Sequence, residues 1–259
     1  MRWRHSLRHV TGASAAERGA MSTYGQFCPV AKAMELLDER WTMLVIRELL
    51  EGSRHFNELR RGVPRMSPAL LSTRLRTLAR AGVIERYEDG SRISYSLTPA
   101  GKELRPIVES IGQWGIRWMP DLGDEDLDPH LLMWDIQRNV DLGVVSPGKT
   151  VLQFIFRDVP AAARDWWLVI TPAGVDLCDS DPGQPVAATV EADLRTLTLL
   201  WRGDLGWAQA LKSGGLELRG SVRERRAIPH LLKRSAFAPV PRPARVPTVG
   251  SPLALSASP

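Results

Sequence analysis

The first third of the chain has apolar residues at helical spacing, followed by one short segment with a period of two. The predicted helices span residues 29–38, 40–50, 57–60 and 67–80. Between 83 and 97 the pattern alternates, and Asp89-Gly90 between two runs of branched and aromatic residues predicts a type I′ hairpin. One more helix is predicted from Thr98 to about Met119. This order predicts a helix-turn-helix followed by a hairpin wing.

The second half of the chain has a different pattern, with strands first and helices later. A helix is predicted from Pro129 to Ile136, and strand-like runs follow at 150–157, 166–171, 174–178 and 186–190. Further helices are predicted at 194–201, 205–211 and 222–232, with a short strand at 216–218. This order predicts an α+β domain with helices on one face of an antiparallel sheet. The predicted fold class is therefore mixed, a winged helix followed by an α+β domain.

A length of 259 residues suits two domains, each with its own core. The predicted boundaries are a basic tail at 1–23, a winged-helix DNA-binding and dimerisation domain at 24–119, an acidic linker at 120–128, an α+β domain at 129–234 and a tail at 235–259. Both tails are expected to be disordered, because they offer little apolar surface to bury. The basic first residues lack the apolar stretch of a secretory signal. Met21 is an alternative start to Met1.

The helix predicted at 67–80 has two unlike faces. Ser67 can accept an orphan backbone N–H, and Pro68 suits the first helical position. The apolar face is formed by Leu71, Leu75 and Leu78. The other face has small residues and arginines but no acid, which favours contact with phosphates and base edges. Taken alone, the pattern also fits an ordinary amphipathic core helix.

Basic residues gather around this helix, since 54–80 contains seven arginines and one acid, Glu58. Arg76 is the candidate for bidentate guanine recognition, and Ser72 and Thr73 are candidates for phosphate or thymine-methyl contact. The complete set of predicted DNA contacts is Arg60, Arg61, Arg65, Ser67, Ala69, Ser72, Thr73, Arg76, Thr77, Arg80 and, at the wing tip, Arg92. Asn57 is the predicted cap of the short helix before it.

The helix predicted from Thr98 has more apolar surface than a small winged domain needs. The residues concerned are Leu104, Ile107, Val108, Ile111, Trp114 and Trp118. Exposed apolar stripes of this size are seldom left unpaired, so we expect a homodimer interface here.

Two cysteines far apart in the sequence argue against a secreted disulfide framework and for a reducing cytoplasm. Cys28 precedes Pro29 at a predicted helix start, where the free N–H groups favour a thiolate, and it is a candidate redox sensor. The alternative for Cys28 is a small capping or packing residue. Cys178 lies in a predicted strand and is expected to be inert.

Signals for other chemistry are missing from the sequence. The five histidines form no ligand cluster, and no run of about 18 apolar residues could span a bilayer. There is no Cys-x-x-Cys, Gly-rich phosphate loop or Gly-x-Ser-x-Gly elbow. We therefore expect a cytoplasmic protein that is not an enzyme and uses no cofactor or metal.

A series of short motifs lies between about Tyr24 and Met119. They are Phe27-Cys28-Pro29-Val30, Arg40-Trp41-Thr42, Arg47-Glu48-Leu49-Leu50, Phe56-Asn57-Glu58-Leu59, Met66-Ser67-Pro68, Leu71-Ser72 and Tyr95-Ser96-Leu97-Thr98-Pro99-Ala100-Gly101. In their order and spacing these motifs resemble the HxlR family of bacterial winged-helix regulators. The resemblance implies a homodimer that places the helix from Ser67 in the major groove of double-stranded DNA, flanked by the hairpin. One departure is Glu39, which stands where the family commonly has Gly.

A second series of short segments lies between about Trp134 and Leu232. They are Trp166-Trp167-Leu168-Val169-Ile170, Val175-Asp176-Leu177-Cys178, Ala192-Asp193-Leu194-Arg195, Trp201-Arg202-Gly203-Asp204, Lys212-Ser213-Gly214 and Leu216-Glu217-Leu218-Arg219-Gly220. In spacing and pattern these segments are similar, more loosely, to sterol-carrier-protein-like domains. This similarity implies a cavity between sheet and helices for an apolar or lipid-like molecule. The expected lining residues are Trp134, Phe154, Trp167 and Trp201. Tryptophans can also fill such a pocket, which leaves a purely structural domain as the alternative.

Together these features predict a dimeric, sequence-specific transcriptional regulator whose second domain binds a small apolar effector. The alternative function, from another class, is a lipid or small-molecule carrier whose winged domain makes protein contacts.

Overall fold

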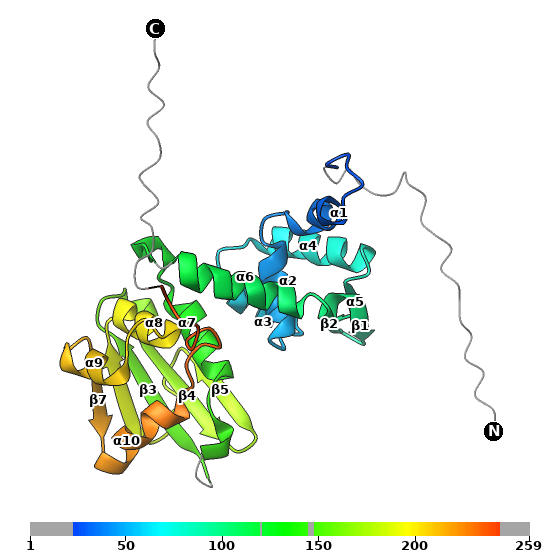
Figure 1. The fold of residues 1–259 in the computed structure, drawn as a ribbon. Coiled ribbons are helices and arrows are strands. Elements are labelled where there is room, and N and C mark those ends of the chain that lie inside the picture. Colours follow the sequence, from blue (N-terminus) through cyan, green and yellow to red (C-terminus); the bar gives the residue numbers. More distant parts are fainter. Residues whose placement is uncertain (1–22, 120, 145–147, 244–259) are drawn as a thin grey trace.

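A computed structural model of the protein describes residues 23–119, 121–144 and 148–243. They form two bodies, and helix α6 (Arg105–Trp118) runs from the wing of the first towards the second (Figure 1). Residues 1–22 of the tail predicted at 1–23 and residues 244–259 of the tail predicted at 235–259 lie outside the described residues.

The first body is a helix-turn-helix with a hairpin wing, as the sequence predicts. Its elements are α1 (Pro29–Leu37), α2 (Thr42–Leu50), α3 (Phe56–Gly62), α4 (Pro68–Arg80), β1 (Ile84–Asp89), β2 (Arg92–Leu97), α5 (Pro99–Lys102) and α6. Leu71, Leu75 and Leu78 of α4 are buried in one apolar cluster with residues of α2, α3 and the start of β1. Ser67 caps α4 as predicted, because its Oγ accepts the Leu70 N–H at 3.3 Å.

Two helix starts in this body differ from the predictions. Helix α2 begins at Thr42 rather than residue 40, because Trp41 has a left-handed backbone with φ of 77°. Helix α3 begins at Phe56, and Asn57 is not its cap. The Glu58 carboxylate instead accepts the backbone N–H groups of Arg54 and His55, at 2.7 and 3.0 Å.

The hairpin turn and the long helix also differ from the predictions. Asp89 pairs with Arg92, so the two central residues of the turn are Gly90 and Ser91. Only Gly90 has a positive φ, of 58°, which is the pattern of a type II′ turn rather than I′. The helix predicted from Thr98 is split into α5 and α6. Pro106 has no N–H for the carbonyl of Lys102, which explains the break.

The second body is an α+β domain built on a five-stranded sheet. Its strands are β3 (Thr150–Phe156), β4 (Asp165–Thr171), β5 (Gly174–Cys178), β6 (Ala188–Ala192) and β7 (Leu216–Gly220). Its α-helices are α7 (Pro129–Arg138), α8 (Leu194–Arg202), α9 (Trp207–Lys212) and α10 (Val222–Leu231). The short 3₁₀ turns are Asp124–Asp126, Leu142–Val144 and Ala161–Ala163.

The sheet is mixed, which corrects the predicted antiparallel arrangement. The strand order is β5-β4-β3-β6-β7, and β6 pairs in parallel with β3 while every other neighbouring pair is antiparallel. After β5 the chain crosses back past the sheet before β6 begins. Core residues of the strands, such as Phe154 and Leu168, share one apolar cluster with α7, α8 and α10.

The segment 235–243 packs onto the rest of the protein, although the sequence predicted a tail from residue 235. Arg242 donates to the Asp204 carboxylate at 2.9 Å and to the Arg202 carbonyl at 2.7 Å. The Phe237 ring lies against Gly112 of α6, where a Cβ would come within 2.3 Å of the ring. A few aromatic and arginine contacts therefore hold a segment whose composition resembles a linker.

Glu48 of α2 joins the two bodies. It belongs to the first body and is fully buried in the complete chain, where its carboxylate accepts hydrogen bonds from Arg138 and from the Trp134 indole, both on α7, at 3.0 and 3.2 Å. Arg47 and Ser53 of the first body complete its set of partners. A Cβ at Gly62 would lie 1.8 Å from the Glu48 carboxyl carbon, so glycine leaves room for this cluster.

Candidate nucleic-acid interface

Helix α4 presents the predicted contact face outwards. Arg76 and Arg80 are exposed, as is Ala69, while Ser72, Thr73 and Thr77 are partly exposed. The Arg76 guanidinium donates to the Thr73 hydroxyl at 3.0 Å, and that hydroxyl donates to the Ala69 carbonyl at 3.0 Å. A guanidinium held along the helix surface in this way is free on its outer side to meet a base edge.

The turn before α4 fixes how the helix projects. Val63 and Met66 are buried, and the Met66 N–H donates to the Val63 carbonyl at 2.9 Å. Ser67 is exposed at the N-terminus of the helix, with its hydroxyl engaged as the cap. The sequence has no acid from residue 59 to 84, so no carboxylate of this stretch weakens its positive potential.

The four predicted arginines outside α4 have different surroundings. Arg60 and Arg65 are exposed beside the helix, and Arg92 is exposed at the wing tip. Arg61 is exposed as well, but its guanidinium lies 5.3 Å from the centroid of the Trp134 ring, in a cation–π contact with the second body.

Arg74 lies in the same helix but has a structural role. Its guanidinium donates to the Glu39 carboxylate and to the Arg40 carbonyl at 3.1 Å, and its side chain is largely buried. The residue that departs from the HxlR pattern, Glu39, therefore anchors the start of α2 to α4. The sequence pattern alone assigns Arg74 no such role. The available signal was Glu39, an acid three residues before α2 begins at Thr42.

The apolar stripe of α6 divides between two surroundings. Leu104 and Val108 pack against the core of the first body. Ile107, Ile111, Trp114 and Trp118 have exposed fractions of 46%, 54%, 57% and 38%. Their spacing places these four on one face of α6, and that face is uncovered in the single chain.

The two cysteines have opposite surroundings. Cys28 precedes α1, and the backbone N–H groups of Ala31 and Val30 lower the pKa of its thiol. For Cys178, burial and the neighbouring charges of Asp176 and Asp179 raise the pKa of the thiol. Cys28 is therefore the more nucleophilic thiol at neutral pH.

The structure does not bring together the four residues expected to line a pocket. Trp134 binds Glu48, Phe154 is fully buried in the second core, and Trp167 lies on β4. Trp201 lines a cavity of about 460 Å³ between the two bodies, and the other three residues are not part of that lining. Another cavity of about 440 Å³ lies between α10 and the sheet.

Two classes of site have no support in the part of the chain that the structure describes. Its His, Cys, Asp and Glu residues form no group of three that could hold a metal ion. None of its helices is long and apolar enough to cross a membrane.

Comparison with known proteins matches residues 36–122 to a family described as HxlR-like helix-turn-helix. The uncharacterized HTH-type transcriptional regulator YvaP of Bacillus subtilis (strain 168) is 40% identical over 98 residues, which are 36% of this chain and 91% of YvaP. The chain belongs to the HxlR-like helix-turn-helix family. It is accordingly a DNA-binding transcriptional regulator rather than an enzyme, and the matched region contains α4 and the wing.

Further matches cover a similar or somewhat larger share of the chain. An uncharacterized HTH-type transcriptional regulator of Synechocystis is 37% identical over 98 residues, covering 37% of this chain and 73% of the relative. The reduced form of the transcriptional regulator YodB from B. subtilis is 29% identical, with a TM-score of 0.32, and covers 35% of this chain and 92% of YodB. The alkylsulfatase Pisa1 of a Pseudomonas species is 19% identical over 44% of this chain and 17% of that enzyme, with a TM-score of 0.35. That likeness is too low to assign a fold family or an activity to any part of the chain.

Proposed function

We propose that this HxlR-like protein is a homodimer that recognises a pseudo-palindromic DNA site through α4. The observation that carries the proposal is the exposed, acid-free face of α4, with Arg76 held against Thr73 by a 3.0 Å hydrogen bond. Each helix reads a half-site in the major groove, with half-sites about 34 Å apart. Arg60, Arg65, Arg80 and the wing residue Arg92 bind phosphates on either side.

A gel shift on the DNA upstream of the protein's own gene tests sequence recognition. We expect retention that survives an excess of random competitor DNA. Equal competition by random DNA, or no retention at any salt concentration, would refute it. The latter result would favour the alternative function, a lipid or small-molecule carrier whose first body contacts protein.

The proposed dimer interface is the uncovered face of α6. An apolar stripe on this face is exposed to water in the single chain and would be buried in a dimer. It consists of Ile107, Ile111, Trp114 and Trp118. Sedimentation velocity on the Ile111→Glu/Trp114→Glu double variant should give a monomer, while the native chain sediments as a dimer. Val222→Glu is the matched control, because Val222 is 55% exposed on the second body. A dimer that survives the double variant would place the interface elsewhere.

For the second body we propose a sterol-carrier-like role in binding an apolar effector. The support is the 440 Å³ cavity between α10 and the sheet, a volume in the range of small-molecule sites. Its apolar lining is Val144, Leu152, Ile170, Ala187, Ala227, Ile228 and Leu231. An occupant that shifts the bodies relative to each other would change DNA affinity, by a coupling of typically about 1–3 kcal/mol.

A thermal-shift screen with long-chain fatty acids and aromatic acids tests this cavity. We expect a ligand that raises the melting temperature of the native chain but not of Ala227→Trp, which fills the space. Ala161→Trp, at an exposed turn, is the control for adding the same ring. If no probe stabilises the native chain, the second body has a purely structural role.

Cys28 completes the proposal as a candidate thiol sensor. Its lowered pKa and its place at the start of α1 support reaction with oxidants or quinones. If DNA binding by Cys28→Ser kept the oxidant sensitivity of the native chain, this part of the proposal would be dropped.

A further inference from the structure

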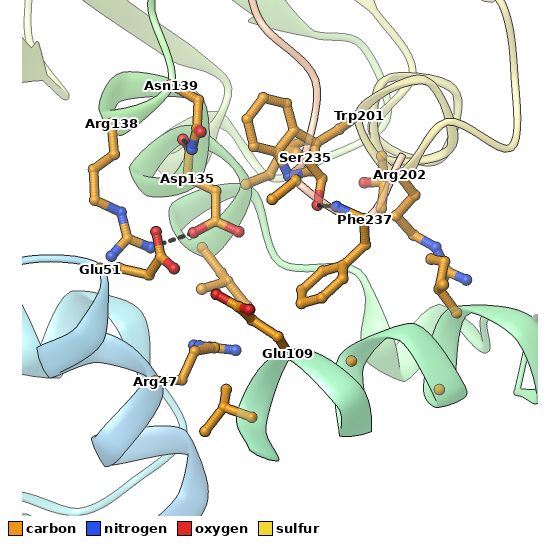
Figure 2. Close-up of a pocket in the computed structure, with 18 of the residues that line it drawn as sticks. Arg47, Glu51, Glu109, Asp135, Arg138, Asn139, Trp201, Arg202, Ser235 and Phe237 are labelled. Carbon is orange, nitrogen blue, oxygen red and sulfur yellow. Dashed lines mark hydrogen bonds and ion pairs between the residues drawn. The ribbon is translucent and has the colours of Figure 1, made fainter. Parts of the chain in front are cut away.

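The larger cavity, of about 460 Å³, lies between the two bodies rather than inside the second (Figure 2). One wall comes from the end of α2 and from α6, and the opposite wall comes from α7 and α8. The segment around Phe237 closes one side, with the Ser235 N–H bonded to the Trp201 carbonyl at 3.0 Å. A molecule in this cavity would touch both bodies at once.

Part of the cavity is apolar and aromatic. Trp201 and Phe237 lie together on one side in Figure 2. The apolar lining as a whole is Leu50, Val108, Ile116, Met119, Leu122, Leu131, Leu132, Trp201 and Phe237. This surface fits a ring system or a short aliphatic body.

The other part of the cavity has carboxylates. Glu51, Glu109 and Asp135 lie around the space in Figure 2, opposite the aromatic side. Asp135 is partly buried between the bodies, and its carboxylate is bonded to Arg138. Among the described residues Glu51 has no cationic partner.

Four arginines also line the cavity, but their charges are already engaged. Arg47 and Arg138 donate to Glu48, at 2.8 and 3.0 Å. Arg105 donates to the Leu50 carbonyl at 2.7 Å and lies 3.7 Å from Glu109. The Nε of Arg202 lies 2.8 Å from the Asp204 carboxylate. Asp135 shares Arg138 with Glu48, Glu109 shares Arg105 with the Leu50 carbonyl, and Glu51 has no cationic partner among the described residues, so these carboxylates keep acceptor capacity for a protonated nitrogen. An anion would instead have to displace existing pairs.

We propose that this interdomain cavity is a binding site for a small aromatic or aliphatic molecule that carries one protonated nitrogen, with Asp135 as its charge partner. The apolar body of the ligand lies against Trp201 and Phe237, and the nitrogen lies on the side of Asp135 and Glu51. The site differs in place and in ligand charge from the cavity beneath α10. Because its walls come from both bodies, an occupant stabilises their present arrangement.

Isothermal titration calorimetry on the full chain, without DNA, tests the site with three matched probes. These are 1-naphthylmethylamine, 1-naphthylmethanol and 1-naphthylacetate, which share a ring and differ in charge. We expect the amine to bind about tenfold or more tightly than the alcohol, and the acetate to bind more weakly than either. Equal binding of amine and alcohol would overturn the charge recognition.

Two variants locate the amine. Asp135→Asn should weaken amine binding by about tenfold or more and leave alcohol binding unchanged, whereas Glu103→Gln, an exposed acid outside the cavity, should change neither. Gly115→Phe should abolish both, because a Cβ at Gly115 meets open space beside the cavity. Amine binding that survives Gly115→Phe would place the site elsewhere, and amine affinity unchanged in Asp135→Asn would refute the role of Asp135. Neither result depends on whether the protein binds DNA.

Discussion

Arg138 of the second body places a guanidinium nitrogen 3.0 Å from a carboxylate oxygen of Glu48, a residue with no exposed surface in the first body. The sequence separates the two by 90 residues. A charge buried in this way must be paired to be tolerated. The first body supplies the buried carboxylate and the second supplies hydrogen-bond donors to it.

Removing Arg138 should therefore destabilise the fold. We expect Arg138→Ala to lower the free energy of unfolding by about 3 kcal/mol, at the low end for breaking a buried pair because Arg47 still binds Glu48. Urea unfolding followed by circular dichroism measures the loss. Arg164→Ala is the control, since Arg164 pairs with Asp165 at the surface, and it should cost less than about 1 kcal/mol. An equal loss of unfolding free energy in the two variants would show that the hydrogen bonds to Glu48 contribute no more than a surface ion pair.

Arg76 should decide sequence preference. Arg76→Ala should cost about 1–3 kcal/mol of binding at the cognate site and much less on random DNA, because a guanidinium reads guanine through two hydrogen bonds. Fluorescence anisotropy with both DNAs provides the comparison. If Arg76→Ala lost the same binding free energy on cognate and on random DNA, Arg76 would contact phosphates rather than a base.

Arg60 and Arg61 are neighbours on α3 but should differ in salt dependence. Arg60 is exposed, so Arg60→Ala should lower the slope of log affinity against log salt by about one. Arg61 lies over Trp134, so Arg61→Ala should lower that slope by less. Titrations at several salt concentrations test both. A full unit lost in Arg61→Ala would show that its guanidinium leaves the ring when DNA binds.

The two cysteines should titrate on opposite sides of an ordinary thiol. A lowered pKa leaves more thiolate at neutral pH, so Cys28 should react with iodoacetamide faster than Cys178, whose pKa is raised. Rates measured against pH in Cys178→Ser and Cys28→Ser chains give the two midpoints. In urea the midpoints should converge, because both shifts arise from the fold. Coincident midpoints in the folded chains would contradict the prediction.

Local signals explain what could be predicted from the sequence. Ser67-Pro68 marks a helix start within a few residues, and the spacing of Leu71, Leu75 and Leu78 identifies the buried face, so α4 and its exposed face were predictable. The strands of the second body were also predictable, since short runs rich in branched and aromatic residues show which residues form them. Such runs do not show which strand lies beside which, and the parallel pairing of β3 with β6 was therefore missed.

Long-range contacts explain what could not be predicted. Glu48 follows Arg47 in an amphipathic helix and reads as a surface charge, because its partners Trp134 and Arg138 are 86 and 90 residues away. Gly62 is needed because a side chain there would collide with the Glu48 carboxylate. This need cannot be inferred before the position of Glu48 is known. The cavity between the bodies has the same origin, since no single segment contains its lining.

The shared Glu48 cluster also bears on how the protein folds as it leaves the ribosome. Domains fold as units during synthesis, the N-terminal one first. The last element of the first body, α6, ends at Trp118, so that body emerges from the ribosome before α7 does. Until α7 packs against it, the Glu48 carboxylate has only Arg47 and Ser53 of its described partners. The emerging first body is then less stable, and the packing of residues 134–138 against it supplies the missing hydrogen bonds.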